Sequence, residues 1–309
     1  MLANGGIAIA KFVAFLVTGS ASMLAESIHS VADTSNQGLL LLGGKRAQRV
    51  ADDRHQFGYG RERYFWAFVV AMVLFALGGL FSIYEGVEKI RHPHEVEALG
   101  WAVGVLLFAI VAEAFSFRTA IIESRKVKGD RKWMDFIRHS RSPELPVVLL
   151  EDAGAMIGLI LALIGVGLAA VTGDVVWDGI GTLSIGILLV VISVVLTIEM
   201  KSLLIGEAAT REHIEAMTQA AAAVPGVTRI IDLKTQHIGP DELLVAAKLE
   251  FDRTFTNPEL SDAIDRVEAS LREAVPLGMQ IYLEPDLFDA GHTDTADTRV
   301  PSHEDAEHD

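Results

Sequence analysis

Long apolar stretches alternate with short polar connections over the first two thirds of the chain. Each stretch is long enough to cross a bilayer as a helix, which takes roughly 20 residues. They lie at about residues 2–19, 22–43, 64–90, 98–122, 146–171 and 175–205. The pattern therefore predicts an α-helical membrane protein with six transmembrane helices. The first stretch begins almost at Met1, so we expect the natural start to lie slightly upstream.

The pattern changes after Lys201 to that of a small water-soluble domain. Helical periodicity at 210–224 and 257–274 alternates with strand patterns at 226–237, 243–251 and 279–284. These elements predict a small cytoplasmic α+β domain in the order α-β-β-α-β. We expect a transmembrane domain at 1–206, a dimerisation domain at 207–288 and a disordered tail containing His and Asp at 289–309.

The second apolar stretch carries ionisable residues. At about 100° per residue, Glu26, His29 and Asp33 fall within roughly 60° of one another on one helix face. Charged groups at membrane depth are costly and usually functional. An imidazole with carboxylates one turn away is also a ligand set for a divalent first-row metal. Taken singly, His29 could be a hydrogen-bonded interior histidine, Asp33 a proton relay, and Glu26 a solvated residue at the membrane surface.

The fifth stretch supplies a second pair of carboxylates, Glu151 and Asp152, in otherwise apolar sequence. If the second and fifth helices pack together, the two groups can share one ion site. Glu151 and Glu26 could belong either to the first shell or to the access pathway. Nearby glycines would permit close approach of neighbouring helices, namely Gly154, Gly158, Gly165 and Gly167.

Composition and charge narrow the function further. Half of the 309 residues are apolar, no cysteine is present, and the formal net charge is −15. Thiolate–metal chemistry is therefore excluded, and a nucleic-acid partner is not expected. Basic residues concentrate in the connections after the second and fourth stretches, which by the positive-inside rule makes these loops and both termini cytoplasmic. No signal-peptide pattern precedes the first stretch.

Two motifs resemble those of the cation diffusion facilitator family. Ser22 to Asp33, SMLAESIHSVAD, is similar to the family's second-span motif, and Asp52 to Glu62, DDRHQFGYGRE, to the loop that follows it. The six stretches, the basic loop after the fourth and the α-β-β-α-β domain extend the resemblance over nearly the whole chain. The segment LLED at 149–152 further resembles the branch that contains the mitochondrial zinc transporter of animals.

The resemblance implies a homodimeric exchanger that moves zinc or a similar divalent cation out of the cytosol against protons, with no organic cofactor. It also implies a tetrahedral transport site with ligands at His29, Asp33 and Asp152. The fourth family position falls on Val148, and valine cannot coordinate a metal. Glu26, Glu151 or a water would then complete the shell. A site with fewer nitrogens is harder, which makes manganese, iron or cobalt plausible alternatives to zinc.

The same family comparison suggests a second, weaker site in the cytoplasmic loop. Asp52 and His55 could bind a further ion, but Tyr59 stands where relatives carry another histidine. The alternative is a tight turn in which Asp52 and His55 pair with loop arginines. In the cytoplasmic domain the aligned zinc positions are Ile231, Lys248 and Leu283, so we expect no zinc site there.

Rival functions are less well supported by the residues. A proton-coupled exchanger of a monovalent cation would favour all-oxygen ligands, whereas His29 precedes Asp33 by one turn. A membrane metalloenzyme would need an HExxH-like pair, which does not occur, so we expect no enzyme. A membrane scaffold would gain nothing evident from buried charges. The compact loops suit a prokaryotic inner membrane.

Overall fold

The structure is a computed structural model that describes residues 2–19, 21–93 and 99–288. It divides into two compact units: Met1–Glu207 with His237–Glu242, and Ala208–Gln236 with Leu243–Asp309. The predicted tail at 289–309 lies outside the described residues. Within some helices, certain side chains are also outside the description, including those of Glu26, His29 and Asp33.

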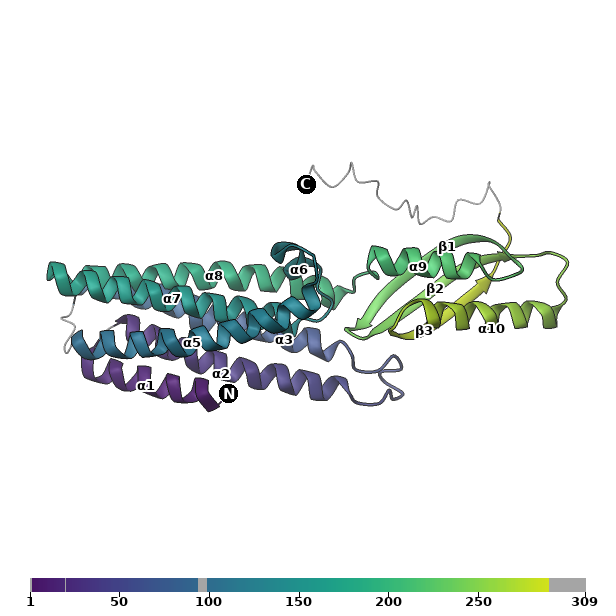
Figure 1. Ribbon diagram of the computed structural model, residues 1–309. Helices are drawn as coiled ribbons and strands as arrows, with labels where there is room; N and C mark the ends of the chain where they lie inside the picture. The colour runs from purple at the N-terminus through teal and green to yellow at the C-terminus, as the bar shows by residue number, and fades with distance from the viewer. Residues whose placement is uncertain (1, 20, 94–98, 289–309) are drawn as a thin grey trace. The chain divides into compact units, whose positions relative to one another are not determined.

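The first unit is a bundle of long helices running side by side (Figure 1). Its helices are α1 (Leu2–Thr18), α2 (Ala21–Ala47), α3 (Glu62–Val73), η1 (Leu74–Leu80), α4 (Phe81–Arg91), α5 (Leu99–Lys128), α6 (Trp133–His139), α7 (Glu144–Thr172) and α8 (Val176–Ile205). The segments α3, η1 and α4 form one continuous rod, with a π-helical turn in the middle. Pattern alone predicted a plain α-helix there.

Four of these helical rods are long and apolar enough to cross a membrane: Glu62–Arg91, Gly100–Lys128, Glu144–Thr172 and Val176–Ile205. Helix α1 contains a shorter apolar segment, Ala8–Val17. Helix α2 covers the predicted stretch 22–43 and extends beyond it to Ala47, carries the polar stripe, and packs against α1, α3 and α7. The helical membrane domain is therefore confirmed, and the number of six spans stays a prediction.

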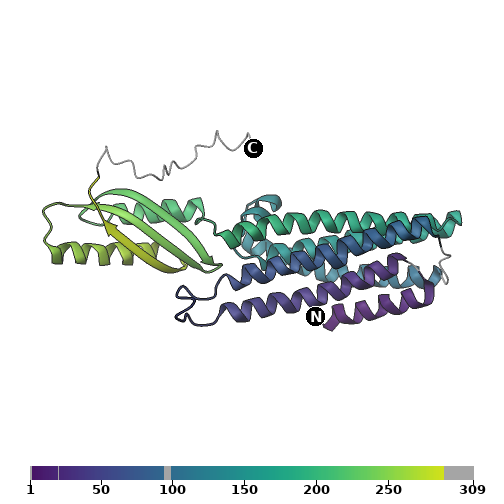
Figure 2. The same cartoon turned by 180° about the vertical axis from the view of Figure 1, so that it is seen from behind.

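The second unit contains α9 (Arg211–Ala222), most of β1 (Val227–Gly239), β2 (Glu242–Phe251), α10 (Asn257–Ala274) and β3 (Gly278–Pro285). The sheet has the order β1-β2-β3. Alternate residues of β2 are buried, including Leu243, Val245 and Leu249, and they pack against α9 and α10. Figure 2 shows both helices on the same face of the sheet. The sequence prediction of a small α-β-β-α-β domain matches these elements.

Local sequence explains where several helices begin and end. Helix α10 starts with a capping box, in which Glu259 accepts from the backbone N–H of Thr256, and Pro258 fits the first turn. Helix α7 ends at Gly173, whose φ of 73° is the left-handed conformation that favours glycine. Such signals are local and therefore readable from the chain alone.

Glycines spaced seven residues apart bring α8 against the rod that contains η1 and α4. A Cβ at Gly186 would lie 2.6 Å from the backbone nitrogen of Ile83, and one at Gly86 would lie 2.6 Å from that of Leu183. Gly79 lies seven residues before Gly86, and Gly179 lies seven residues before Gly186. A Cβ at either position would also make a close contact with the opposite helix. In α7, Gly165 approaches Gly181 as predicted, whereas a Cβ added at Gly167 would meet no atom of another helix within 4 Å among the described residues, so a packing role for Gly167 stays a prediction.

Gly186→Ala is expected to destabilise the bundle. Its Cβ would meet backbone atoms of Ile83 and Gly79, which cannot rotate away, and overpacking of this kind costs about 1–3 kcal/mol. Gly167→Ala is the matched control, because it meets open space and gains about 1 kcal/mol of helix propensity. Thermal unfolding in detergent should show a lower Tm for Gly186→Ala alone. Equal Tm values for the two variants would contradict the close packing.

Candidate metal transport site

Helix α2 presents the predicted ionisable stripe on continuous helical backbone. The helix runs unbroken from Ala21 to Ala47, so His29 and Asp33 lie one turn apart, and Glu26 lies one turn before His29. Their side chains lie outside the described ones. Contacts of their neighbours on α2 therefore define the surroundings of the stripe.

Helix α7 places two adjacent carboxylates inside the bundle. The side chains of Glu151 and Asp152 are only 4% and 6% exposed. The Nδ2 of Asn36, on α2, donates to the Oε1 of Glu151 across 2.6 Å. The two helices predicted to share a site are thus joined by a buried hydrogen bond beside Asp152.

Asp152 is held by a different neighbour. The hydroxyl of Ser116, on α5, donates to its Oδ2 across 3.0 Å. Adjacent residues on a helix point about 100° apart, which explains why Glu151 contacts α2 while Asp152 contacts α5. The carboxylate pair of α7 is therefore linked to α2 through Glu151 and to α5 through Asp152.

Val148 borders an open cavity of about 690 Å³. The cavity lies between α2, α3 and α7 and is lined by Gln37, Leu40, Leu41, Gly44, Lys45, Gln48, Arg63, Glu144 and Val148. Its polar lining includes an ion pair in which Nε of Arg63 lies 2.5 Å from Oε1 of Glu144. Val148, which lines the cavity, lies one helical turn before Asp152 on α7. The cavity therefore reaches from the basic end of α2 to the neighbourhood of the buried carboxylates.

Lys11 and Glu113 are among the buried charges that the sequence analysis did not single out. Lys11 on α1 is 1% exposed, and its Nζ donates to the Oγ of Ser30 across 2.7 Å. Glu113 on α5 is 7% exposed. Both were visible in the sequence as charges within apolar stretches. Because Ser30 follows His29 directly, Lys11 brings a buried positive charge to the polar stripe of α2.

Family comparisons decide what class of protein carries this arrangement. The family model for the cation efflux transmembrane domain matches residues 1–205, and that for the cation efflux protein cytoplasmic domain matches residues 209–286. The chain belongs to the cation efflux family. This confirms the resemblance to the cation diffusion facilitators that the motifs on α2 and in its following loop indicated.

Individual relatives support the same membership. The mouse (Mus musculus) protein "Proton-coupled zinc antiporter SLC30A9, mitochondrial" is 34% identical over 252 residues, which are 81% of this chain and 44% of that protein. "Metal tolerance protein C4" of Arabidopsis thaliana is 28% identical over 78% of this chain and 53% of its own length. "Magnetosome protein MamB" of Paramagnetospirillum magneticum is 26% identical over 88% of this chain and 87% of its own length. The chain thus spans less than half the length of the first relative.

In this cation efflux protein the loop residues Asp52 and His55 form a compact turn. Oδ1 of Asp52 accepts from the backbone N–H groups of Arg54 and His55, and Oδ2 accepts from the Tyr59 hydroxyl across 2.6 Å. Nδ1 of His55 lies 3.5 Å from Asp52. The Tyr59 hydroxyl, followed by the backbone donor of His55, lowers the pKa of Asp52 to about 2. The guanidinium of Arg49 stacks on the Tyr59 ring, and metal binding at Asp52 and His55 stays a prediction.

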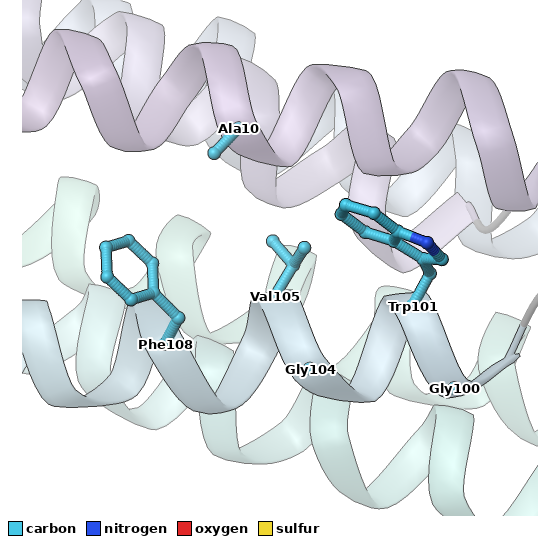
Figure 3. A pocket seen from close by; sticks show the side chains of 6 residues that line it. All are labelled: Ala10, Gly100, Trp101, Gly104, Val105 and Phe108. Carbon is cyan, nitrogen blue, oxygen red and sulfur yellow. The ribbon is translucent and has the colours of Figure 1, made fainter.

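A further cavity of the bundle is apolar. The cavity between α1 and α5 in Figure 3 is lined by Ala10, Gly100, Trp101, Gly104, Val105 and Phe108, which offer no metal ligand. Among the described side chains, which exclude Glu26, His29 and Asp33, no group of three His, Cys, Asp or Glu forms a metal cluster.

In the cytoplasmic unit, Lys248 lies 3.7 Å from Oε1 of Glu284 and 3.7 Å from Oδ2 of Asp286. Lys248 occupies one of the positions at which we expect no zinc ligand. A lysine ammonium placed between two carboxylates already supplies positive charge at this point. The expectation that no zinc is bound there stays a prediction.

Proposed function

We propose that this protein exports a divalent metal cation, with zinc as the principal substrate, from the cytosol in exchange for protons. The observation that carries the proposal is the buried junction of α2 and α7, where Asn36 bonds Glu151 next to Asp152. Buried carboxylates in a membrane helix are costly unless they serve an ion or a proton. The family membership makes cation efflux the matching activity, and the mouse relative is by name a proton-coupled zinc antiporter.

We assign the transport ligands to His29, Asp33 and Asp152, while Glu26 and Glu151 complete the shell or line the approach. A divalent cation requires neutral imidazole and ionised carboxylates, so protons compete with the metal for the same groups. Metal entering from one side and protons entering from the other would therefore occupy the site alternately. The cavity lined by Glu144 and Val148 is the cytosolic approach in this scheme.

The proposal includes the organisation of the protein in its membrane. Six helices span the bilayer with both termini in the cytosol, and the cytoplasmic unit forms a homodimer, as the matching cytoplasmic-domain family suggests. A prokaryotic inner membrane suits the compact loops. The protein acts as a transporter and not as an enzyme.

Manganese, iron or cobalt is the second candidate substrate, and one observation favours it. Val148 offers no ligand at the fourth family position and instead borders the cavity. The remaining assigned ligands contain a single nitrogen, and oxygen-rich sites suit harder cations than zinc.

A metal panel in proteoliposomes tests this proposed function. The purified full chain is reconstituted with a metal-sensitive dye inside vesicles, and zinc, manganese, iron(II), cobalt and sodium are added separately. We expect a proton gradient, acidic inside, to drive uptake of zinc above that of the other cations. Uptake of every divalent cation at the rate of protein-free vesicles would refute the proposal.

A further inference from the structure

Asn36 lies on the same face of α2 as the predicted metal ligands. It follows His29 by seven residues and Asp33 by three, which places it within about 20° of His29 and about 60° of Asp33 around the helix. Its side chain is fully buried, with 0% exposure. Because an asparagine carries no charge, its position within the stripe gives little signal in the sequence.

The hydrogen bond to Glu151 fixes which way the amide points. An ionised carboxylate can only accept, so the amide nitrogen of Asn36 faces Glu151, as the 2.6 Å contact shows. The amide oxygen is then directed elsewhere. Within the part of the chain that the structure describes, this Oδ1 is buried and has no hydrogen-bond partner.

A buried acceptor without a partner calls for an occupant. Leaving such an atom unsatisfied costs about 1–3 kcal/mol, and an unplaced water or ion is a common reason for it. An amide oxygen is also a good ligand for a hard divalent cation. The neighbouring residue Gln37 and the α7 residue Val148 both border the cavity that leads inward, so a cation entering there arrives beside Asn36.

We propose that Oδ1 of Asn36 coordinates the transported divalent cation and supplies the ligand missing at Val148. This inference rests on the proposed function. The ligand set becomes His29, Asp33, Asp152 and Asn36, with one nitrogen and three oxygens. Its two carboxylates balance the charge of a divalent cation, because neutral histidine and asparagine add none.

Glu151 then acts as a positioning residue. Its carboxylate holds the amide nitrogen of Asn36 and thereby aims Oδ1 at the cation. A glutamine at 151 would keep this contact, because its carbonyl oxygen also accepts from Nδ2. This distinguishes the proposal from an arrangement in which Glu151 itself coordinates the metal.

Three variants separate these roles in the vesicle assay, scored by zinc uptake and by the zinc-to-manganese uptake ratio. Asn36→Leu is expected to reduce zinc uptake at least about tenfold and to change the ratio. Glu151→Gln is expected to lower zinc uptake less than Asn36→Leu does and to leave the zinc-to-manganese ratio unchanged. The double variant Asn36→Asp/Glu151→Gln moves the carboxylate to position 36 and the amide to position 151. We expect it to transport metal, with the zinc-to-manganese uptake ratio shifted about tenfold toward manganese.

Ser35→Ala is the control on α2, because Ser35 is exposed and its hydroxyl donates to the backbone oxygen of Val31 on the same helix. Elution as a single species in size-exclusion chromatography shows which variants fold. If Asn36→Leu does not fold, the exchanged pair decides the question by its metal ratio. The inference is overturned if the folded Asn36 variants take up zinc at the wild-type rate with an unchanged zinc-to-manganese ratio. It is also overturned if the single substitution Glu151→Gln abolishes transport. Absence of divalent transport in the wild type overturns the proposed function instead.

Discussion

Asp152→Asn is expected to reduce zinc transport by about 100-fold or more. The substitution keeps size and hydrogen bonding but removes the negative charge that a divalent cation needs in a site with little water. Loss of a residue that merely supports a metal ligand costs 10–100-fold, so loss of an assigned ligand should exceed that range. Zinc uptake into vesicles at matched protein content measures the effect.

Two further variants test whether the loss of zinc transport in Asp152→Asn comes from the missing charge at this position. Ser116→Ala removes only the hydroxyl that donates to Asp152 across 3.0 Å, and it should slow transport by no more than about 10–100-fold. Asp174→Asn removes an acidic group from an exposed connection, where its Oδ1 accepts from the backbone N–H of Val176, and it should transport normally. Zinc uptake by Asp152→Asn within a few-fold of wild type would remove Asp152 from the site.

Asp178→Leu is expected to lower the free energy of unfolding by about 1–3 kcal/mol, because it removes a buried carboxylate whose charge attracts the buried ammonium of Lys89. Asp178 is fully buried near the start of α8, and its carboxylate lies within electrostatic range of Lys89, which is 6% exposed. Glu85 is the other carboxylate that attracts Lys89. Without Asp178, the buried ammonium of Lys89 keeps, among the groups that the structure describes, only the attraction of Glu85 to offset the cost of its burial.

A double-mutant cycle separates the pair from general packing. Lys89→Leu combined with Asp178→Leu removes both charges, so it should be more stable than Asp178→Leu alone. Denaturant unfolding in detergent, followed by tryptophan fluorescence, gives the free energies. Additive destabilisation by the two single substitutions would show that the charges do not interact.

The helices of the membrane domain and the order of the cytoplasmic elements could be predicted because their signals are local. Apolar length marked α7 and α8 to within two residues, and the Asn257–Pro258 pair marked the start of α10. The π-helical turn at Leu74–Leu80 was not predictable in this way. Its LFALGGL sequence has no local feature that distinguishes a π-helix from an α-helix, and the turn coincides with the glycine contact to α8.

The candidate site was predictable only in part, for a related reason. Helical periodicity places His29 and Asp33 on one face of α2, but it says nothing about which atoms of α7 they meet. Asn36 became informative only through the direction of its amide, which depends on Glu151 more than a hundred positions away in the chain. Lys11 shows a different gap, because its charge was visible in the sequence but its partner Ser30 lies on another helix.

Simultaneous measurement of zinc and proton movement tests the central claim most directly. Vesicles containing the wild-type protein carry one dye for zinc and one for internal pH, and zinc is added outside while the interior is acidic. We predict that zinc entry is accompanied by alkalinisation of the interior, and that both signals disappear together in Asp152→Asn. Zinc entry without proton release, or equal signals in the variant, would contradict a proton-coupled metal site between α2 and α7.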